Sequence, residues 1–146
     1  MKERGGKKLY LSEGESPYGI WAEIRPIGED VQISVGGGDR DHIGAVALAE
    51  PSVTVHPVTG EAVSLTAGES SGFSRIQLLS AAGHKDAAIA QMFAGAFCDA
   101  FQVNVSAVAG VHIDQATDEE IDILMGNASA LLQEAIDAWR VCTEIE

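Results

Sequence analysis

Short stretches in the first half of the chain alternate apolar and polar residues, as β-strands do when one face is buried. Residues 20–25 and 31–35 alternate in this way, and the segment between them contains Pro26 and Gly28. We predict that these two stretches form a hairpin. Further strands are predicted at residues 43–49, 53–55, 61–66 and 74–80, with a turn at residues 57–60.

The second half of the chain changes to the period of an amphipathic helix. Apolar residues recur at intervals of three and four positions between residues 84 and 101, which predicts a first long helix. Residues 117–120 have the sequence of a capping box, and we expect a second helix from there to about Trp139. Residues 103–111 predict a strand between the helices. Strands first and helices later predict an α+β domain, with a mostly antiparallel sheet and both long helices packed on one face.

The length of 146 residues suits one domain. We expect residues 1–16 to be a mobile N-terminal tail and residues 17–146 to form this domain. Cys98 and Cys142 lie in helical patterns, and a lone pair of cysteines is weak support for a disulfide framework. We therefore expect reduced thiols and a cytoplasmic protein. Apolar strands in so small a protein also favour a symmetric homodimer.

The formal net charge of -13 narrows the classes of partner. A charge of this sign repels the phosphate backbone of nucleic acids and anionic membranes at long range. The sequence also lacks an uninterrupted apolar run of about 18 residues, the length that a membrane-spanning helix requires. We therefore expect neither nucleic acid nor a membrane as a partner.

Three of the four histidines lie in short motifs where strands and helices are predicted to begin or end. The motifs are Asp41-His42-Ile43-Gly44, Gly83-His84-Lys85-Asp86 and Val111-His112-Ile113-Asp114. Neutral imidazoles are the commonest transition-metal ligands, and three of them can leave one coordination position open. We predict a divalent metal bound by His42, His84 and His112, with Asp114 as an additional ligand. For each motif, a solvated or semi-buried histidine beside turn residues remains the alternative.

A glycine-rich segment and a helix start are the two candidate anion sites. Gly36-Gly37-Gly38-Asp39-Arg40-Asp41 follows a predicted strand, and consecutive glycines let backbone amides approach an anion closely. The sequence His84-Lys85-Asp86 opens the first helix, where free amides and the positive end of the helix dipole favour anions. A flexible hairpin turn and a solvated helix start are the alternatives, and both remain open.

The histidine motifs and the segment that follows them resemble a known family. The residues that carry the resemblance are His42-Ile43-Gly44-Ala45-Val46, Gly83-His84-Lys85-Asp86, Ala109-Gly110-Val111-His112-Ile113-Asp114 and Ala116-Thr117-Asp118-Glu119-Glu120-Ile121. Their order resembles that of the small D subunit of gallate decarboxylase, which typifies the LpdD-like prenylated-flavin chaperones. The resemblance covers roughly residues 17–138 and includes the glycine-rich stretch before His-Ile-Gly.

This resemblance implies an accessory protein that binds prenylated FMN and supports a UbiD-type non-oxidative decarboxylase, rather than a catalyst of decarboxylation. No catalytic residue is assigned. Because only 5% of the residues are aromatic, we expect mostly aliphatic side chains around the flavin ring. We expect the cofactor to contact residues of the glycine-rich segment and of the histidine motifs: Gly36, Gly37, Gly38, Arg40, Gly44, His84, Lys85, Asp86 and Gly110.

Two other functions fit the same residues. One is a small histidine–metal enzyme that activates water or dioxygen, with Asp114 or Asp41 as the base. The other is a structural subunit that docks on a larger decarboxylase and binds no small molecule. Flavin-like absorbance after co-expression with a flavin prenyltransferase would support the chaperone. A bound redox metal with turnover would support the enzyme, and a stable complex that lacks both would support the structural subunit.

The metal prediction can be tested through pH. If neutral His42, His84 and His112 bind a divalent ion, its affinity should fall as the pH drops through about 6.5, because protons compete for the same nitrogens. Isothermal titration with a divalent metal at several pH values measures this. Affinity that stays unchanged down to about pH 5 would exclude imidazole ligands.

Overall fold

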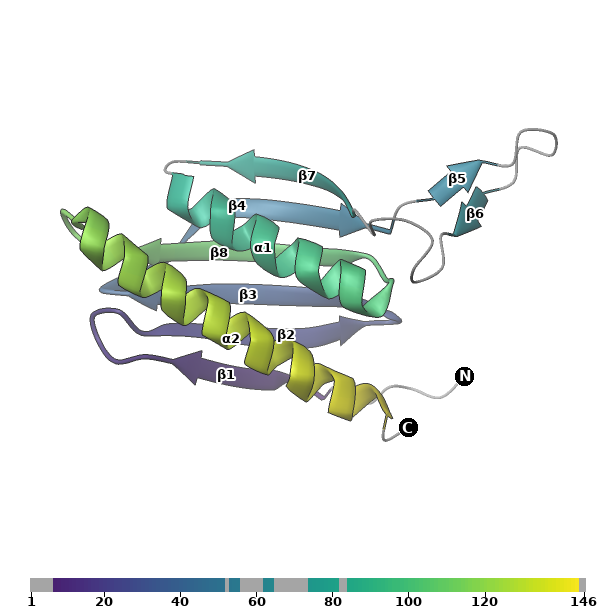
Figure 1. The fold of residues 1–146 in the computed structure, drawn as a ribbon, viewed down its shortest axis with the longest axis horizontal. Helices are drawn as coiled ribbons and strands as arrows, with labels where there is room; N and C mark the ends of the chain where they lie inside the picture. The colour runs from purple at the N-terminus through teal and green to yellow at the C-terminus, as the bar shows by residue number, and fades with distance from the viewer. Residues whose placement is uncertain (1–6, 52, 56–61, 65–73, 82–83, 145–146) are drawn as a thin grey trace.

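A six-stranded sheet forms the centre of the computed structural model, which describes residues 7–51, 53–55, 62–64, 74–81 and 84–144. In spatial order the strands of this sheet are β1 (Leu9–Glu13), β2 (Ile20–Ile27), β3 (Asp30–Gly38), β8 (Val105–His112), β4 (Arg40–Glu50) and β7 (Arg75–Ser80). A separate two-stranded sheet pairs β5 (Val53–Val55) with β6 (Ala62–Ser64). Figure 1 shows both sheets.

The pairing within the large sheet is antiparallel except at its centre, where β3 and β8 are parallel. Strand β8 lies between β3 and β4, although β3 and β4 follow each other directly in the sequence. It is parallel to the first and antiparallel to the second. The ends of β3 and β8 therefore meet the beginning of β4 at one end of the sheet.

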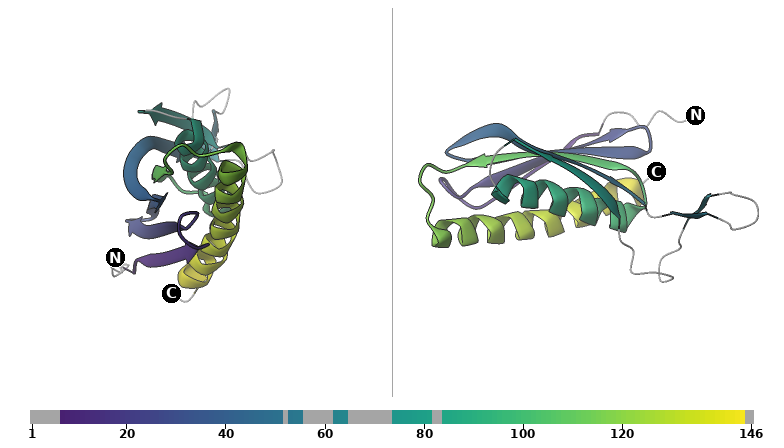
Figure 2. Two further views of the ribbon diagram at one scale, coloured as in Figure 1. Left: turned by 90° about the vertical axis from the view of Figure 1, so that its left-hand side faces the viewer. Right: turned by 90° about the horizontal axis from the view of Figure 1, so that it is seen from above.

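Two helices cover one face of this sheet (Figure 2). Helix α1 (His84–Phe101) contacts β4, β7 and β8, and helix α2 (Asp118–Glu144) contacts β1 and β2. The largest fully buried helical side chains are Ile89, Phe93, Phe97, Leu124 and Leu131. Burying a side chain of this kind stabilises the fold by about 1.5–3 kcal/mol relative to leaving it exposed. The predicted α+β class, with both helices on one face, is confirmed.

The N-terminal segment differs from its prediction. The expected tail of residues 1–16 includes β1, which pairs along its length with β2. Leu9 and Leu11 pack against the core while Tyr10 between them is exposed, so this short stretch has the alternation of a strand. The predicted turn at residues 57–60 lies outside the described residues.

Cys98 and Cys142 are both free thiols, as expected for reduced cysteines. Neither of the two helices in the described part of the chain combines the length and apolarity that crossing a membrane would require.

The capping box predicted before α2 is present. The Glu120 carboxylate accepts a hydrogen bond from the Thr117 amide at 3.1 Å, and the Thr117 hydroxyl accepts one from the Glu120 amide at 3.2 Å. The bond from the Thr117 amide also lowers the pKa of the Glu120 carboxyl. The backbone amides of Thr117 and Glu120 are therefore each satisfied by the side chain of the other residue.

Thr117→Ala should lower the free energy of unfolding by about 1 kcal/mol, because the amide of Glu120 loses its acceptor. Urea unfolding measures the change. Thr117→Ser is the matched control, since it keeps a hydroxyl and should stay close to the wild type. Equal loss in both variants would mean that the threonine methyl group, rather than the cap, stabilises this position.

Candidate functional site

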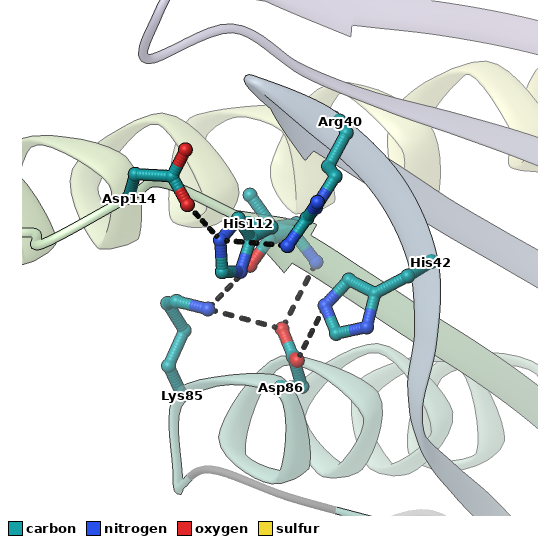
Figure 3. Close-up of polar contacts among 7 residues, drawn as sticks. Arg40, His42, Lys85, Asp86, His112 and Asp114 are labelled. Atoms are coloured by element: carbon teal, nitrogen blue, oxygen red, sulfur yellow. Dashed lines mark hydrogen bonds and ion pairs between the residues drawn. The ribbon is translucent and has the colours of Figure 1, made fainter.

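The strand ends that carry two of the histidine motifs meet at one end of the large sheet. His112, the last residue of β8, is aligned with Gly38 at the end of β3 and with Arg40 at the start of β4. Helix α1 begins at the same end, so Lys85 and Asp86 lie beside these strands (Figure 3). The topology therefore brings together segments that are far apart in the sequence.

A β-bulge in β4 shapes the site. Asp41 is aligned with Val111 of β8, but the next aligned pair is Ala45 with Ala109, so the register shifts across residues 42–44. Bulges of this kind bend a strand and redirect its side chains. His42 lies in this bulge, and its imidazole reaches the start of α1.

Asp86 lies at the centre of the polar contacts and is the only buried charged residue among those described, with 2% of its surface exposed. Its Oδ1 accepts a hydrogen bond from the Val111 amide at 3.0 Å and lies 3.4 Å from the Lys85 ammonium. Its Oδ2 lies 3.1 Å from Nε2 of His42. A buried carboxylate without such partners would lose several kcal/mol of hydration without replacement. These contacts are therefore what allows a charge at this position.

Lys85 and Asp86 together attach α1 to β8. The Lys85 ammonium donates a hydrogen bond to the carbonyl of Val111, the residue whose amide donates to Asp86. Consecutive side chains of the helix thus satisfy both backbone groups of one strand residue. Val111 lies next to the bulge, where regular pairing with β4 is interrupted, and buried backbone groups require a partner of some kind.

Two predicted glycines allow these close approaches. A Cβ at Gly44 would overlap the carboxylate of Asp86, and a Cβ at Gly110 would overlap the backbone carbonyl of His42. Any larger residue would move either the buried carboxylate or the bulge. Both glycines therefore contribute to the site by leaving space, and their predicted contact with a cofactor stays a prediction.

The rings of His42 and His112 lie edge to face, with centroids 5.9 Å apart. Nε2 of His112 lies 2.6 Å from the Asp114 carboxylate and 3.3 Å from the guanidinium of Arg40. The hydrogen bond and the charge interaction with His112 lower the pKa of Asp114. Each histidine is thus paired with its own carboxylate, and the two pairs lie side by side.

The three-histidine metal site stays a prediction. The structure brings His42 and His112 together, but the side chain of His84, the first residue of α1, lies outside the described part. Within the described ranges, no group of three or more histidine, cysteine or acidic side chains is placed to hold a metal ion. The two imidazoles alone do not make the metal site that the sequence predicts.

The triple glycine differs from the expected loop, because residues 36–38 form the end of β3: all three pair with β8, and Gly36 and Gly37 also pair with β2. The amide of Gly38 donates to the Gly19 carbonyl at 2.9 Å, and the amide of Asp39 donates to the His112 carbonyl at 2.6 Å. These two amides are occupied by backbone partners. A role of the glycines in cofactor binding stays a prediction.

Trp21 contacts Asp41 of the first histidine motif, and the sequence analysis missed this contact. Its indole Nε1 donates to the Asp41 carboxylate at 2.9 Å, and its ring stacks on Tyr10 with centroids 5.9 Å apart. Its neighbours Ile20 and Ala22 are buried, so Trp21 belongs to the strand face opposite the core. A large aromatic residue at a position where alternation predicts a polar one was the available signal.

Comparison with models of known families identifies the family of this chain. The model of the family described as "prenylated flavin chaperone LpdD-like domain" matches residues 14–140. The chain belongs to this family. The resemblance seen in the histidine motifs is thereby confirmed, and the match to the LpdD-like family spans β2 to most of α2.

Comparison with solved structures shows a similar fold and no more. A chain in the crystal structure described as a novel chaperone complex for yeast 20S proteasome assembly is similar, with a TM-score of 0.54 and 10% sequence identity. The similarity covers 94% of the LpdD-like chain and 97% of the yeast one. At this identity the similarity shows a shared architecture. No curated protein sequence matches the chain.

Gly44→Ala should lower the free energy of unfolding by about 1–3 kcal/mol, because the new methyl group would overlap the buried Asp86 carboxylate. Gly126→Ala is the matched control: this glycine lies in α2, and a Cβ there has no described atom within 4 Å. The control should gain up to about 1 kcal/mol from helix propensity. Urea unfolding of both variants checks this, and a Gly44→Ala protein as stable as the wild type would contradict the described packing.

Proposed function

We propose that this LpdD-like protein binds prenylated FMN at the end of the sheet where β3, β4, β8 and α1 meet, and supports a UbiD-type decarboxylase. The observation that carries the proposal is the clustering of Arg40, His42, Lys85 and His112 around one helix start, in a chain of the prenylated flavin chaperone family. When bound, prenylated FMN would supply the redox-active ring, and the chain would hold and orient it.

The charges at this end fit a phosphate group at Arg40. Arg40 is exposed and lies beside His112, while Lys85 is already engaged with Asp86 and the Val111 carbonyl. Arg40 therefore contributes the guanidinium that is accessible to a phosphate, and planar bidentate contact with phosphate is a common role of arginine. The start of α1, at the same end of the sheet, adds the partial positive charge of its helix dipole, which also favours a phosphate.

The flavin ring needs a partly apolar surface next to this charge. Ile43 of the bulge exposes 69% of its surface although it is a large aliphatic residue. It lies between His42, which contacts Asp86, and Gly44, which leaves space for the Asp86 carboxylate. An exposed isoleucine beside paired imidazoles suits a ligand with both a planar apolar ring and polar edges.

Several finer features belong to the proposal. We expect a cytoplasmic protein that acts as a homodimer and passes its flavin to the decarboxylase. A divalent metal at His42, His84 and His112 stays part of the proposal, and Arg40, which lies beside His112, would contribute positive charge for the phosphate in either case.

Arg40→Ala should weaken binding of prenylated FMN about 10- to 100-fold, since a hydrogen bond to a charged group contributes about 1.5–3 kcal/mol. Binding is measured by titrating the purified protein with the cofactor and following the flavin absorbance. Arg25→Ala is the matched control, because Arg25 is also exposed but lies near the opposite end of β2.

The control should bind as the wild type does. A wild-type protein that binds no prenylated FMN, alone or after co-expression with a flavin prenyltransferase, would refute the proposed function. Equal weakening in both arginine variants would instead indicate a general charge effect, with no phosphate contact at Arg40.

A further inference from the structure

We infer that Asp86 is a positioning residue that fixes His42 in the tautomer protonated at Nε2. Nδ1 of His42 is then a hydrogen-bond acceptor offered to an N–H group of the flavin ring. The inference rests on the proposed function for the identity of the ligand. The tautomer itself follows from contacts within the chain.

The two oxygens of the Asp86 carboxylate have different partners. Asp86 is buried and has Val111 and Lys85 as donors to Oδ1, which leaves Oδ2 facing Nε2 of His42 at 3.1 Å. A carboxylate accepts hydrogen bonds and cannot donate them. Nε2 must therefore carry the proton, and a neutral imidazole with a proton on Nε2 has its lone pair on Nδ1.

Contacts on two edges fix the orientation of the His42 ring. A Cβ at Gly110 would lie 3.1 Å from Cδ2 of His42, so the Cδ2 edge of the imidazole faces β8. Nε2 faces Asp86, as Figure 3 shows. The opposite edge carries Nδ1, and the side chain as a whole is 37% exposed. Asp86 and Gly110 together thus fix which edge of the ring remains for a ligand.

The free nitrogen of His42 selects the kind of ligand group that it can contact. A lone pair on Nδ1 repels a phosphate oxygen but accepts a hydrogen bond from an N–H group, and the pyrimidine-like edge of a flavin carries such a group between two carbonyls. Arg40, which only donates, suits the phosphate instead. The site therefore separates two tasks: Arg40 binds the anionic group and His42 recognises the ring. This arrangement follows the pattern in which one partner of a histidine sets the role of its other nitrogen.

The decisive measurement is long-range ¹H–¹⁵N NMR of the imidazole rings in ¹⁵N-labelled protein, which distinguishes the two neutral tautomers from the charged ring. We expect the Nε2–H tautomer for His42 in the wild type. Addition of FMN should then shift the Nδ1 resonance of His42 in the direction of an acceptor that gains a hydrogen bond. An Nδ1–H tautomer in the wild type would overturn the inference without any substitution.

Asp86→Asn tests the positioning role. The asparagine amide can donate toward Nε2, so His42 should lose its uniform Nε2–H tautomer, and FMN binding should weaken about tenfold, the effect of one hydrogen bond of about 1.4 kcal/mol. Asp114→Asn is the matched control for the tautomer, because Asp114 contacts His112 and not His42. In this control His42 should keep the same tautomer as in the wild type.

The outcomes separate this inference from the proposed function. If FMN binds the wild type without moving Nδ1 of His42, the recognition role fails and the proposed function stands. If FMN and prenylated FMN both fail to bind, the proposed function and the recognition role of His42 both fail, and the NMR spectrum of the free protein still decides its tautomer. An Asp86→Asn protein that is folded and keeps the Nε2–H tautomer would show that Asp86 does not position the ring.

Discussion

The structure of the site depends on one buried carboxylate with three donors from different parts of the chain. Asp86 receives the Val111 amide from β8, the Lys85 ammonium from its own helix and the His42 imidazole from the bulge of β4. Removing any donor would leave part of a buried charge unpaired, and the energetic penalty for that is larger than the net gain of a single hydrogen bond. The carboxylate therefore couples a helix start, a strand end and a bulge into one unit.

Two glycines make this coupling possible because they leave room where a side chain would collide. The bulge can approach the helix because Gly44 has no side chain, and it can approach β8 because Gly110 has none. The apolar core supplies the rigid support: Ile89 and Phe93 of α1 are fully buried one and two turns after Asp86. A functional side chain held by packed neighbours keeps its geometry better than one on a free loop.

Periodic elements were predictable from the sequence, and their spatial order was not. Helix α1 has the predicted bounds of 84–101, because its apolar residues recur with helical spacing over five turns. Strand β1 was missed because its five residues follow a basic tail. The insertion of β8 between β3 and β4 has no local signal, since it depends on pairing between segments about seventy residues apart. For the same reason, the motifs indicated where chemistry lies but not that Asp86 contacts Val111 or that Trp21 contacts Asp41.

The position of β8 in the sheet also determines when, during synthesis, the protein can first bind its ligand. Strands β3 and β4 are neighbours in the chain, yet they leave a gap that a strand made much later must fill. Until residues 105–112 have left the ribosome, the Val111 partner of Asp86 and the His112 ring are missing, and the sheet has two unpaired inner edges. Ligand capture is therefore expected only after translation has passed β8, so an incomplete chain would have no competent site in which to hold a reactive flavin.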